Sequence, residues 1–320
     1  MRKITVFLCM ATAMFFISCD QENTDDIEPI EPIAEEIIYI ADENFKHALV
    51  STNSIDTTGD GEGDSDIDLN NDGEIQRSEA NAIEGLIINF YDLEINSFLD
   101  LTGIENFVNL NYLKMTGDRD FSGEENSESN LITYDFSALE KLEFLEINNL
   151  FTNYMEALNL SGLSNLKEIR LMSNRPYFYE GANDNYSLPI NFMDVNMEGL
   201  ISLTTLNIHN SYLFIDYCQV PSLKYLDTSY LEGGEPEVFD FHCLTELEYL
   251  DISDNHIVSL ILKNGSLLNT LVARDIGYGE DGFANYYYLE YICIDDIPEE
   301  YDQIASLRDD DTVVVTDCEF

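Results

Sequence analysis

Leucine and isoleucine recur along most of the chain in one pattern, L-x-x-L-x-L-x-x-N. The best copy lies in the segment LTELEYLDISDNHI, where the pattern positions are filled by Leu247, Leu250, Ile252 and Asn255. Nine approximate copies, 20 to 37 residues apart, begin at Ile83, Leu110, Leu142, Leu166, Leu203, Leu223, Leu247, Leu268 and Leu289. A recurring period of this kind predicts a chain of stacked repeating units.

This period is typical of leucine-rich repeats. One repeat cannot bury its leucines alone, so neighbouring copies stack around a shared core. We therefore expect the α/β class: a leucine-rich repeat solenoid with a curved parallel sheet, an irregular convex side and a small helical N-terminal cap. About nine repeats are expected over 83–297, between a helical cap at 37–82 and a C-terminal cap at 298–320. At the asparagine position, Asn174 and Asn255 are expected to bind backbone groups in the turn.

Residues between the leucines point outward from the concave sheet of such a solenoid. The third position of successive repeats is occupied by Tyr112, Phe144, Glu168, Thr205, Tyr225, Tyr249, Thr270 and Tyr291. Exposed aromatic rings beside hydrogen-bonding groups are used by protein hot spots and by sugar sites. We therefore predict a ligand-binding row of Tyr112, Phe144, Tyr225, Tyr249 and Tyr291. The alternative is that these rings only pack on one another, because aromatic residues stabilise neighbouring strands.

Two insertions between repeats are also rich in aromatic residues and glycine. They are RPYFYEGANDNY at 175–186 and GYGEDGFANYYY at 277–288. Loops on a rigid scaffold often carry recognition, so both are candidate binding surfaces. They can equally be bulges that cover the edge of a repeat.

Residues 68–79, DLNNDGEIQRSE, have the ligand spacing of an EF-hand calcium loop. Calcium takes six to eight hard oxygen ligands, and a glycine at position 6, here Gly73, allows the sharp turn. We therefore predict calcium as a cofactor, and the alternative is a solvated acidic turn. The predicted ligands are Asp68, Asn70, Asp72, the peptide carbonyl of Glu74, Gln76 and Glu79. Acidic residues at every second position from Asp60 to Asp68 leave a second ion open, since a glutamate at position 12 is lacking.

The first residues have the layout of a secretory signal. A short basic stretch precedes an apolar run at 4–17 and then Ser18 and Cys19. The segment FISC resembles a bacterial lipobox, which implies a lipoprotein signal peptide at 1–18 and lipidation of Cys19. Residues 19–36 are acidic and lack periodicity, as expected of a flexible tether. The alternative is an ordinary cleaved signal whose cysteine is incidental.

The remaining cysteines point to an oxidising compartment. After Cys19 there are four, which allow three pairings. Cys218 and Cys243 precede the first leucines of adjacent repeats by five and four residues, whereas Cys293 lies in the last predicted strand and Cys318 is two residues from the C-terminus. The repeat register therefore predicts the disulfides Cys218–Cys243 and Cys293–Cys318.

Charge and motifs narrow the function classes. The chain has 63 Asp and Glu against 14 Lys and Arg, a formal net charge of −49. This charge disfavours nucleic acids and anionic lipid headgroups as partners and favours metal cations and basic partners. The four histidines are scattered, and the sequence has no H-E-x-x-H or G-x-S-x-G motif. We therefore expect a protein that is not an enzyme.

Together, the segment ADENFKHALV, the loop DLNNDGEIQRSEA, the repeats and the terminal ICIDD…DC element resemble the secreted and surface leucine-rich repeat proteins of Bacteroidetes, especially flavobacteria. The acidic stretch after Cys19 also resembles the surface-export signal of Bacteroidetes lipoproteins. The resemblance covers about 37–320 and implies protein or glycan binding at a cell surface. The C-terminal sorting domain typical of the family is absent from this sequence, which fits lipid anchoring instead.

These observations predict a lipid-anchored binding or adhesion protein of the outer membrane or cell surface. It would contact the membrane only through its anchor and recognise a protein ligand through the concave face or the aromatic insertions. The alternative is a glycan-binding accessory lipoprotein of a nutrient-uptake system. A hydrolase with its site in the insertions is a third possibility.

Overall fold

The computed structural model describes residues 35–93, 99–117, 132–150, 155–175, 193–231, 237–276, 289–308 and 310–318. The chain divides into two units, residues 1–34 and 35–320, and the described residues all lie in the second. The predicted signal peptide, Cys19 and most of the tether are therefore outside the described residues. None of the described helices is long and apolar enough to cross a membrane.

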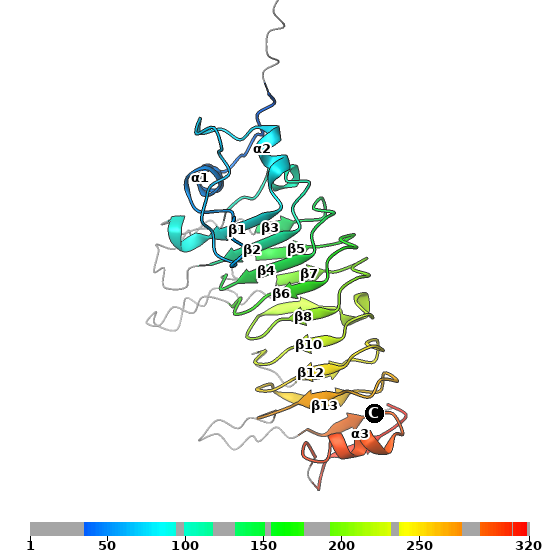
Figure 1. Ribbon diagram of the computed structural model, residues 1–320. Helices are drawn as coiled ribbons and strands as arrows, with labels where there is room; N and C mark the ends of the chain where they lie inside the picture. Colours follow the sequence, from blue (N-terminus) through cyan, green and yellow to red (C-terminus); the bar gives the residue numbers. More distant parts are fainter. Residues whose placement is uncertain are drawn as a thin grey trace, which may run out of the picture. The chain divides into compact units, whose positions relative to one another are not determined.

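Eight parallel strands form the main sheet of this second unit, and Figure 1 shows them following one another along it. In spatial order they are β1 (Gly85–Asn89), β2 (Tyr112–Thr116), β4 (Phe144–Asn148), β6 (Glu168–Arg170), β8 (Thr205–Asn207), β10 (Tyr225–Asp227), β12 (Tyr249–Asp251) and β14 (Thr270–Val272). Each strand begins two residues after the first leucine or isoleucine of a predicted repeat. The leucine-rich repeat solenoid is thereby confirmed for eight copies.

The core is built from the repeated leucine positions. In each coil these side chains point away from the outward-facing positions of the main sheet and pack against their equivalents in the next coil. The first leucines Leu110, Leu142, Leu166, Leu203, Leu223 and Leu247 are all 0% exposed. Stacking is what buries them, since each coil covers the apolar side of its neighbour.

Asparagine side chains link successive coils through the backbone. Asn255 donates from Nδ2 to the Thr228 carbonyl at 2.9 Å and accepts from the Leu231 N–H at 2.8 Å. Asn174, which is fully buried, donates in the same way to the carbonyl of Ile147 in the preceding coil at 2.7 Å. The predicted role of the asparagine position is therefore confirmed at both residues.

The return segments of the coils form strands of their own, which corrects the expectation of an irregular convex side. One four-stranded parallel sheet contains β3 (Ile132–Asp135), β5 (Met155–Asn159), β7 (Met193–Asn196) and β9 (Leu213–Ile215). Another contains β11 (Glu237–Asp240), β13 (Ile257–Ile261), β15 (Tyr291–Cys293) and β16 (Val313–Val315). The return segments carry buried residues at alternate positions, as Met193 and Val195 do in β7, and a strand places such residues on one face.

The ninth predicted repeat, from Leu289, does not extend the main sheet. Its strand β15 pairs with β13 and β16, so that Tyr291 lies opposite Ser259 and Val313. The starts of β14 and β15 are 21 residues apart, and the predicted insertion at 277–288 supplies most of that length. Without the insertion the spacing is close to the 8 residues between the starts of β12 and β13, so β15 falls where a return strand begins.

Two short helices cover the N-terminal end of the main sheet. They are α1 (Glu43–Ser51), whose first turn is capped by Asp42, and α2 (Arg77–Ala82). The segment before α1 pairs with the acidic loop through the Ile38 N–H and the Ile75 carbonyl, 2.8 Å apart. Further along, the Ile87 N–H of β1 donates to the Ser54 carbonyl at 2.7 Å, which fixes the helical unit on the first coil.

Short 3-10 helices occupy several turns: η1 (Phe90–Leu93), η2 (Ile104–Asn106) and η4 (Tyr217–Gln219). The last helix, α3 (Pro298–Gln303), precedes β16 at the C-terminal end. There the buried Glu300 has its pKa raised to about 7, chiefly by burial and then by the nearby Asp295 carboxylate. The disulfides Cys218–Cys243 and Cys293–Cys318 confirm the predicted pairing, and the second ties β15 to the segment after β16.

Candidate functional site

The predicted outward row lies across the main sheet. Of the eight third positions, strand pairing puts seven directly beside one another, in the order Tyr112, Phe144, Glu168, Thr205, Tyr225, Tyr249 and Thr270. All four aromatic residues among them are half-buried. Tyr291 does not belong to the row, because its strand lies in a return sheet. The expectation that it continues the row is therefore corrected.

The aromatic residues of the row form two stacked pairs. Tyr112 and Phe144 have ring centroids 4.8 Å apart and planes within 5° of each other. Tyr225 and Tyr249 are closer, at 4.3 Å and 6°. Each ring therefore has one face covered by its neighbour, so packing across strands and presentation of an aromatic surface are combined in the same residues.

A charged cluster separates the two pairs. Arg170 on β6 pairs with Glu168 at 2.6 Å and with Glu146 at 3.5 Å. Its guanidinium also lies 5.2 Å from the centre of the Phe144 ring, a cation–π contact. Because the arginine already has these partners, the first aromatic pair is bordered by a satisfied charge network.

The second pair is bordered by acidic side chains. Asp227 and Asp251 lie two residues after Tyr225 and Tyr249 on the same strands and are beside each other in the sheet. Burial, followed by Tyr249 and the Asp227 carboxylate, raises the pKa of Tyr225 to about 12. The Tyr225 hydroxyl therefore keeps its proton at neutral pH. This end of the main sheet offers flat aromatic rings, hydroxyl groups and negative charge in one place.

The predicted calcium loop, 68–79, is folded as a tight turn. Asn71 and Gly73, at loop positions 4 and 6, have positive φ angles of 59° and 78°. The Asp68 carboxylate, only 4% exposed, accepts from the Gly73 N–H at 2.7 Å. This hydrogen bond holds the Asp68 side chain, at position 1, close to the backbone of Gly73, at position 6, as in a loop that wraps a cation.

The ligand set fits calcium in chemistry, although its carboxylates are spread apart. Glu79 accepts from the Leu69 N–H and the Gln76 N–H, both at 2.9 Å. Gln76 in turn donates to Asp72 at 2.8 Å. Asp68, Asp72 and Glu79 do not bring one oxygen each within 4.8 Å of one another. Cation binding would therefore exchange these local hydrogen bonds for direct coordination by the same oxygens.

The segment 56–64 repeats this turn with Asp56 at position 1, whereas the sequence pattern counted the oxygen donors of a second candidate site from Asp60. Asp56 accepts from the Gly61 N–H at 2.7 Å, again from position 1 to position 6. Gly59 and Gly61, at positions 4 and 6, have φ angles of 80° and 85°. The amide of Gly61, assisted by Gly59, lowers the pKa of Asp56. The usable signal was the spacing of Asp56, Asp60 and Gly61, which the alternation of acidic residues further along concealed.

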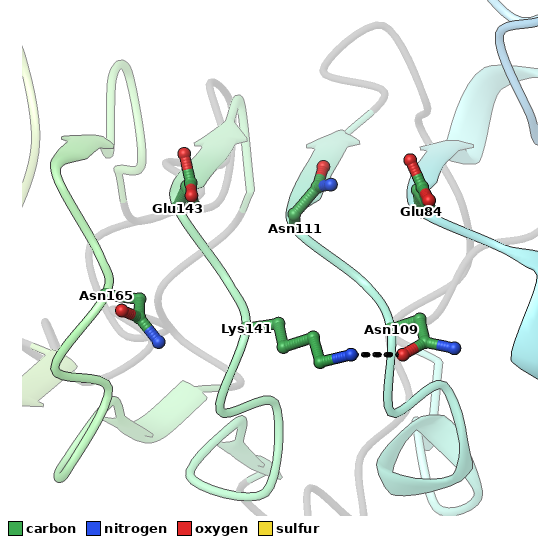
Figure 2. A pocket seen from close by; sticks show the side chains of 6 residues that line it. All are labelled: Glu84, Asn109, Asn111, Lys141, Glu143 and Asn165. Carbon is green, nitrogen blue, oxygen red and sulfur yellow. Dashed lines mark hydrogen bonds between the residues drawn. The ribbon is translucent and has the colours of Figure 1, made fainter.

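A polar hollow of about 270 Å³ lies before the strands of the first coils, and Figure 2 shows the six side chains that line it. They are Glu84, Asn109, Asn111, Lys141, Glu143 and Asn165. Lys141 points to Asn109 and donates to its side-chain oxygen at 2.5 Å. Asn109 donates to the Asn81 carbonyl of α2 at 2.7 Å, and Asn165 donates to the Glu140 carbonyl of the preceding coil at 2.8 Å. These bonds between coils give the hollow a structural role.

The predicted insertion 277–288 and all but the first residue of 175–186 lie outside the described residues. Within the described ranges, one group of three His, Cys, Asp or Glu side chains gathers its potential ligand atoms within 4.8 Å: Cys218, His242 and Cys243. Two of these form a disulfide, so their sulfur atoms are already bonded to each other.

The sequence matches no family model and no curated protein. Solved structures similar to this chain include three internalins of Listeria monocytogenes. InlF aligns with 16% identity over 86% of this chain and 74% of its own, with a TM-score of 0.34. InlC2 aligns with 17% identity over 76% of this chain and 99% of its own, also with a TM-score of 0.34. The functional domain of InlJ, which includes a cysteine ladder, aligns with 14% identity over 85% of this chain and 68% of its own, with a TM-score of 0.32. The fold described above rests on strand order and repeat register alone.

Proposed function

We propose that the protein is a non-enzymatic binding module that recognises a protein ligand through the main sheet. The observation that carries this is the in-register row with its stacked pair of Tyr225 and Tyr249 beside Asp227 and Asp251. Half-buried tyrosines lose little side-chain entropy on binding and present both an apolar ring and a hydroxyl. The acidic border favours a ligand with basic groups.

Replacing both tyrosines tests this assignment. Tyr225→Ala with Tyr249→Ala is expected to weaken ligand binding by at least about tenfold, because hot-spot tyrosines contribute on the order of 2 kcal/mol. The measurement is biolayer interferometry against proteins captured from envelope extracts. Tyr39→Ala with Tyr91→Ala is the matched control, since these tyrosines are 78% and 63% exposed and lie outside the row. Equal binding by the row variant and the control would remove the row from the interface.

Glycan binding is the second candidate, because sugars also stack on aromatic rings beside carboxylates. A glycan array and the envelope capture, run on the same protein with and without calcium, separate the two ligand classes. Turnover on a panel of glycoside and peptide substrates would contradict the non-enzymatic assignment.

We also propose that the 68–79 loop binds calcium. Asp68, Asn70, Asp72, Gln76 and Glu79 would supply side-chain oxygens, and Glu74 its peptide carbonyl. The ion would add positive charge to an acidic turn and close the helical cap over the first coil. The supporting observations are the oxygen-only donor set and the positive φ angles at loop positions 4 and 6.

The proposed cellular address is the outer surface of the cell, with a lipid anchor at Cys19. Two disulfides support a location outside the cytoplasm. Cys19→Ser is expected to move the protein from the membrane fraction to the soluble fraction, since the substituted chain cannot carry the lipid. Ultracentrifugal fractionation with immunodetection measures this. Membrane association that persists in the variant would rule out the anchor.

A further inference from the structure

The two return sheets are separated at one place, between β9 and β11. These strands belong to successive coils, yet within the described residues β9 pairs with β7 and β11 pairs with β13. In the same two coils the main-sheet strands β8 and β10 are paired without interruption. The break is therefore local to the return side.

The side chains at the ends of the return strands also change at the break. In earlier coils the residue at the end of the return strand bonds to its equivalent in the next coil: Asn159 donates to Asp135 at 3.0 Å and Asn196 to Asn159 at 3.2 Å. At β9 and β11 the equivalent residues are Asp216 and Asp240. A carboxylate lacks the N–H group through which asparagine donates in this ladder. The ladder of side-chain hydrogen bonds stops where the sheets part.

The break forms a notch of about 510 Å³ with an apolar floor and an acidic rim. Phe239 in its wall is buried, whereas Phe214 and Val238 are 68% and 61% exposed. Both exposed side chains line the notch, as do Asp216 and Asp240. An exposed apolar patch rimmed by polar groups on a soluble protein is typical of an interaction site.

The far end of the notch is fixed by covalent structure. Cys218 and Cys243 form a disulfide that joins the two coils, with Cα atoms 5.0 Å apart. Beside it, His242 places Nδ1 2.8 Å from Asp240 and Nε2 3.1 Å from the Cys243 sulfur. The rim is therefore held in place before a ligand binds, which lowers the entropic cost of binding.

We propose that this notch binds an extended peptide segment of the protein ligand in which an apolar residue and a basic residue stand two positions apart, on the same face of the peptide. The apolar side chain packs between Phe214 and Val238, and the basic side chain lies between Asp216 and Asp240. Strands β9 and β11 each end a sheet on this side, so their edges offer backbone groups to an extended chain. The proposal rests on the protein-binding function and adds a second contact surface and a ligand chemistry to it.

Charge complementarity favours this occupant over a second copy of the chain. A copy would bring an identical acidic rim and a net charge of −49 against the same notch. A peptide with lysine and valine two positions apart supplies positive charge and apolar contact on the same face of an extended strand.

The test is a fluorescence anisotropy titration of the full mature chain with three capped hexapeptides. In each peptide serine occupies every second position, and the positions between carry lysine and valine, lysine and glycine, or glutamate and valine, so that the two test residues share one face. At physiological salt we expect the lysine–valine peptide to bind at least about tenfold more tightly than either other peptide. Only this peptide offers a basic side chain to Asp216 and Asp240 together with an apolar side chain to Phe214 and Val238. Equal affinity for the lysine–valine and lysine–glycine peptides would overturn the proposal by showing nonspecific charge attraction.

Variants locate the binding. Phe214→Ser with Val238→Ser is expected to abolish the preference for the lysine–valine peptide over the lysine–glycine peptide. Asp216→Asn with Asp240→Asn is expected to weaken binding of the lysine–valine peptide about tenfold. Asparagine can still accept the backbone N–H bonds that these aspartates accept, from Cys218 and His242. Glu156→Gln with Asp194→Asn removes the same charge from exposed positions on β5 and β7 and should leave the affinity within about twofold. Unchanged binding in the Phe214 and Val238 variant overturns the proposal.

Two further experiments distinguish failure of the notch proposal from failure of the main-sheet proposal. The Tyr225→Ala and Tyr249→Ala variant should bind the peptide normally, so loss of envelope ligand with retained peptide binding reports on the main sheet alone. Analytical ultracentrifugation checks the other occupant. A dimer that dissociates in the Phe214→Ser and Val238→Ser variant would assign the notch to self-association and overturn the peptide assignment.

Discussion

Calcium in about hundredfold excess over its Kd is expected to raise the melting temperature by roughly 5 to 10 °C. Such an excess stabilises the folded state by about 2.7 kcal/mol if the unfolded chain does not bind the ion. The physical reason is that the ion would neutralise the carboxylates of Asp68, Asp72 and Glu79, two of which are at most 5% exposed. Differential scanning calorimetry with calcium and with chelator measures the shift.

Asp68→Ala with Glu79→Ala is expected to remove this calcium response, because it deletes the first and last ligands of the loop. Glu43→Ala with Glu84→Ala is the matched control: it removes two exposed carboxylates near the same cap without touching the loop, and should retain the full response. Magnesium should give a smaller shift, since it demands stricter octahedral geometry. A calcium shift of the same size in the ligand variant would refute the site.

Loss of the Cys218–Cys243 disulfide is expected to cost about 3 kcal/mol of unfolding free energy, which lowers the melting temperature by roughly 6 to 12 °C. The bridge closes a loop with a sequence separation of 25 residues, and in the chain-entropy model it acts by restricting the unfolded chain. Urea unfolding of Cys218→Ser with Cys243→Ser against the unsubstituted protein measures the difference. A change below about 1 kcal/mol would contradict this role.

The second disulfide supplies a matched comparison. Cys293–Cys318 has the same sequence separation, so its removal should cost a similar free energy. The two variants should differ in where the structure loosens. Hydrogen exchange should rise at β15 and β16 without the terminal bridge, and around the notch without the Cys218–Cys243 bridge. Only loss of the Cys218–Cys243 bridge should weaken binding of the lysine–valine peptide.

The main-sheet strands could be predicted because the leucine pattern determines both where each strand begins and which residues of the next coil lie beside it. Each coil must place its leucines over those of the previous coil, so the spacing from Leu223 to Leu247 also fixes Tyr225 beside Tyr249. The same register brought Cys218 to Cys243. Local spacing was enough here, since neighbours in sequence are also neighbours in space.

Tyr291 shows where this reasoning stops. Its repeat fits the leucine pattern, yet whether its strand joins the main sheet or a return sheet depends on the length of chain between β14 and β15. A pattern of apolar residues indicates a buried face and leaves the pairing partner open. The notch escaped prediction for a related reason, since neither Asp216 nor Asp240 is unusual until the fold brings their strands into adjacent coils.

The repeat, the positions of the main-sheet strands, the disulfide pairs and the spacing of the acidic loop could all be read from the sequence, because each follows from residues at fixed separations along the chain. Tertiary structure decided which strands share a sheet, that the aromatic row consists of two stacked pairs, and that the return side is broken between β9 and β11. These depend on which side chains meet across coils. The repeat pattern does not specify these contacts, because it fixes only which residues are buried in each coil.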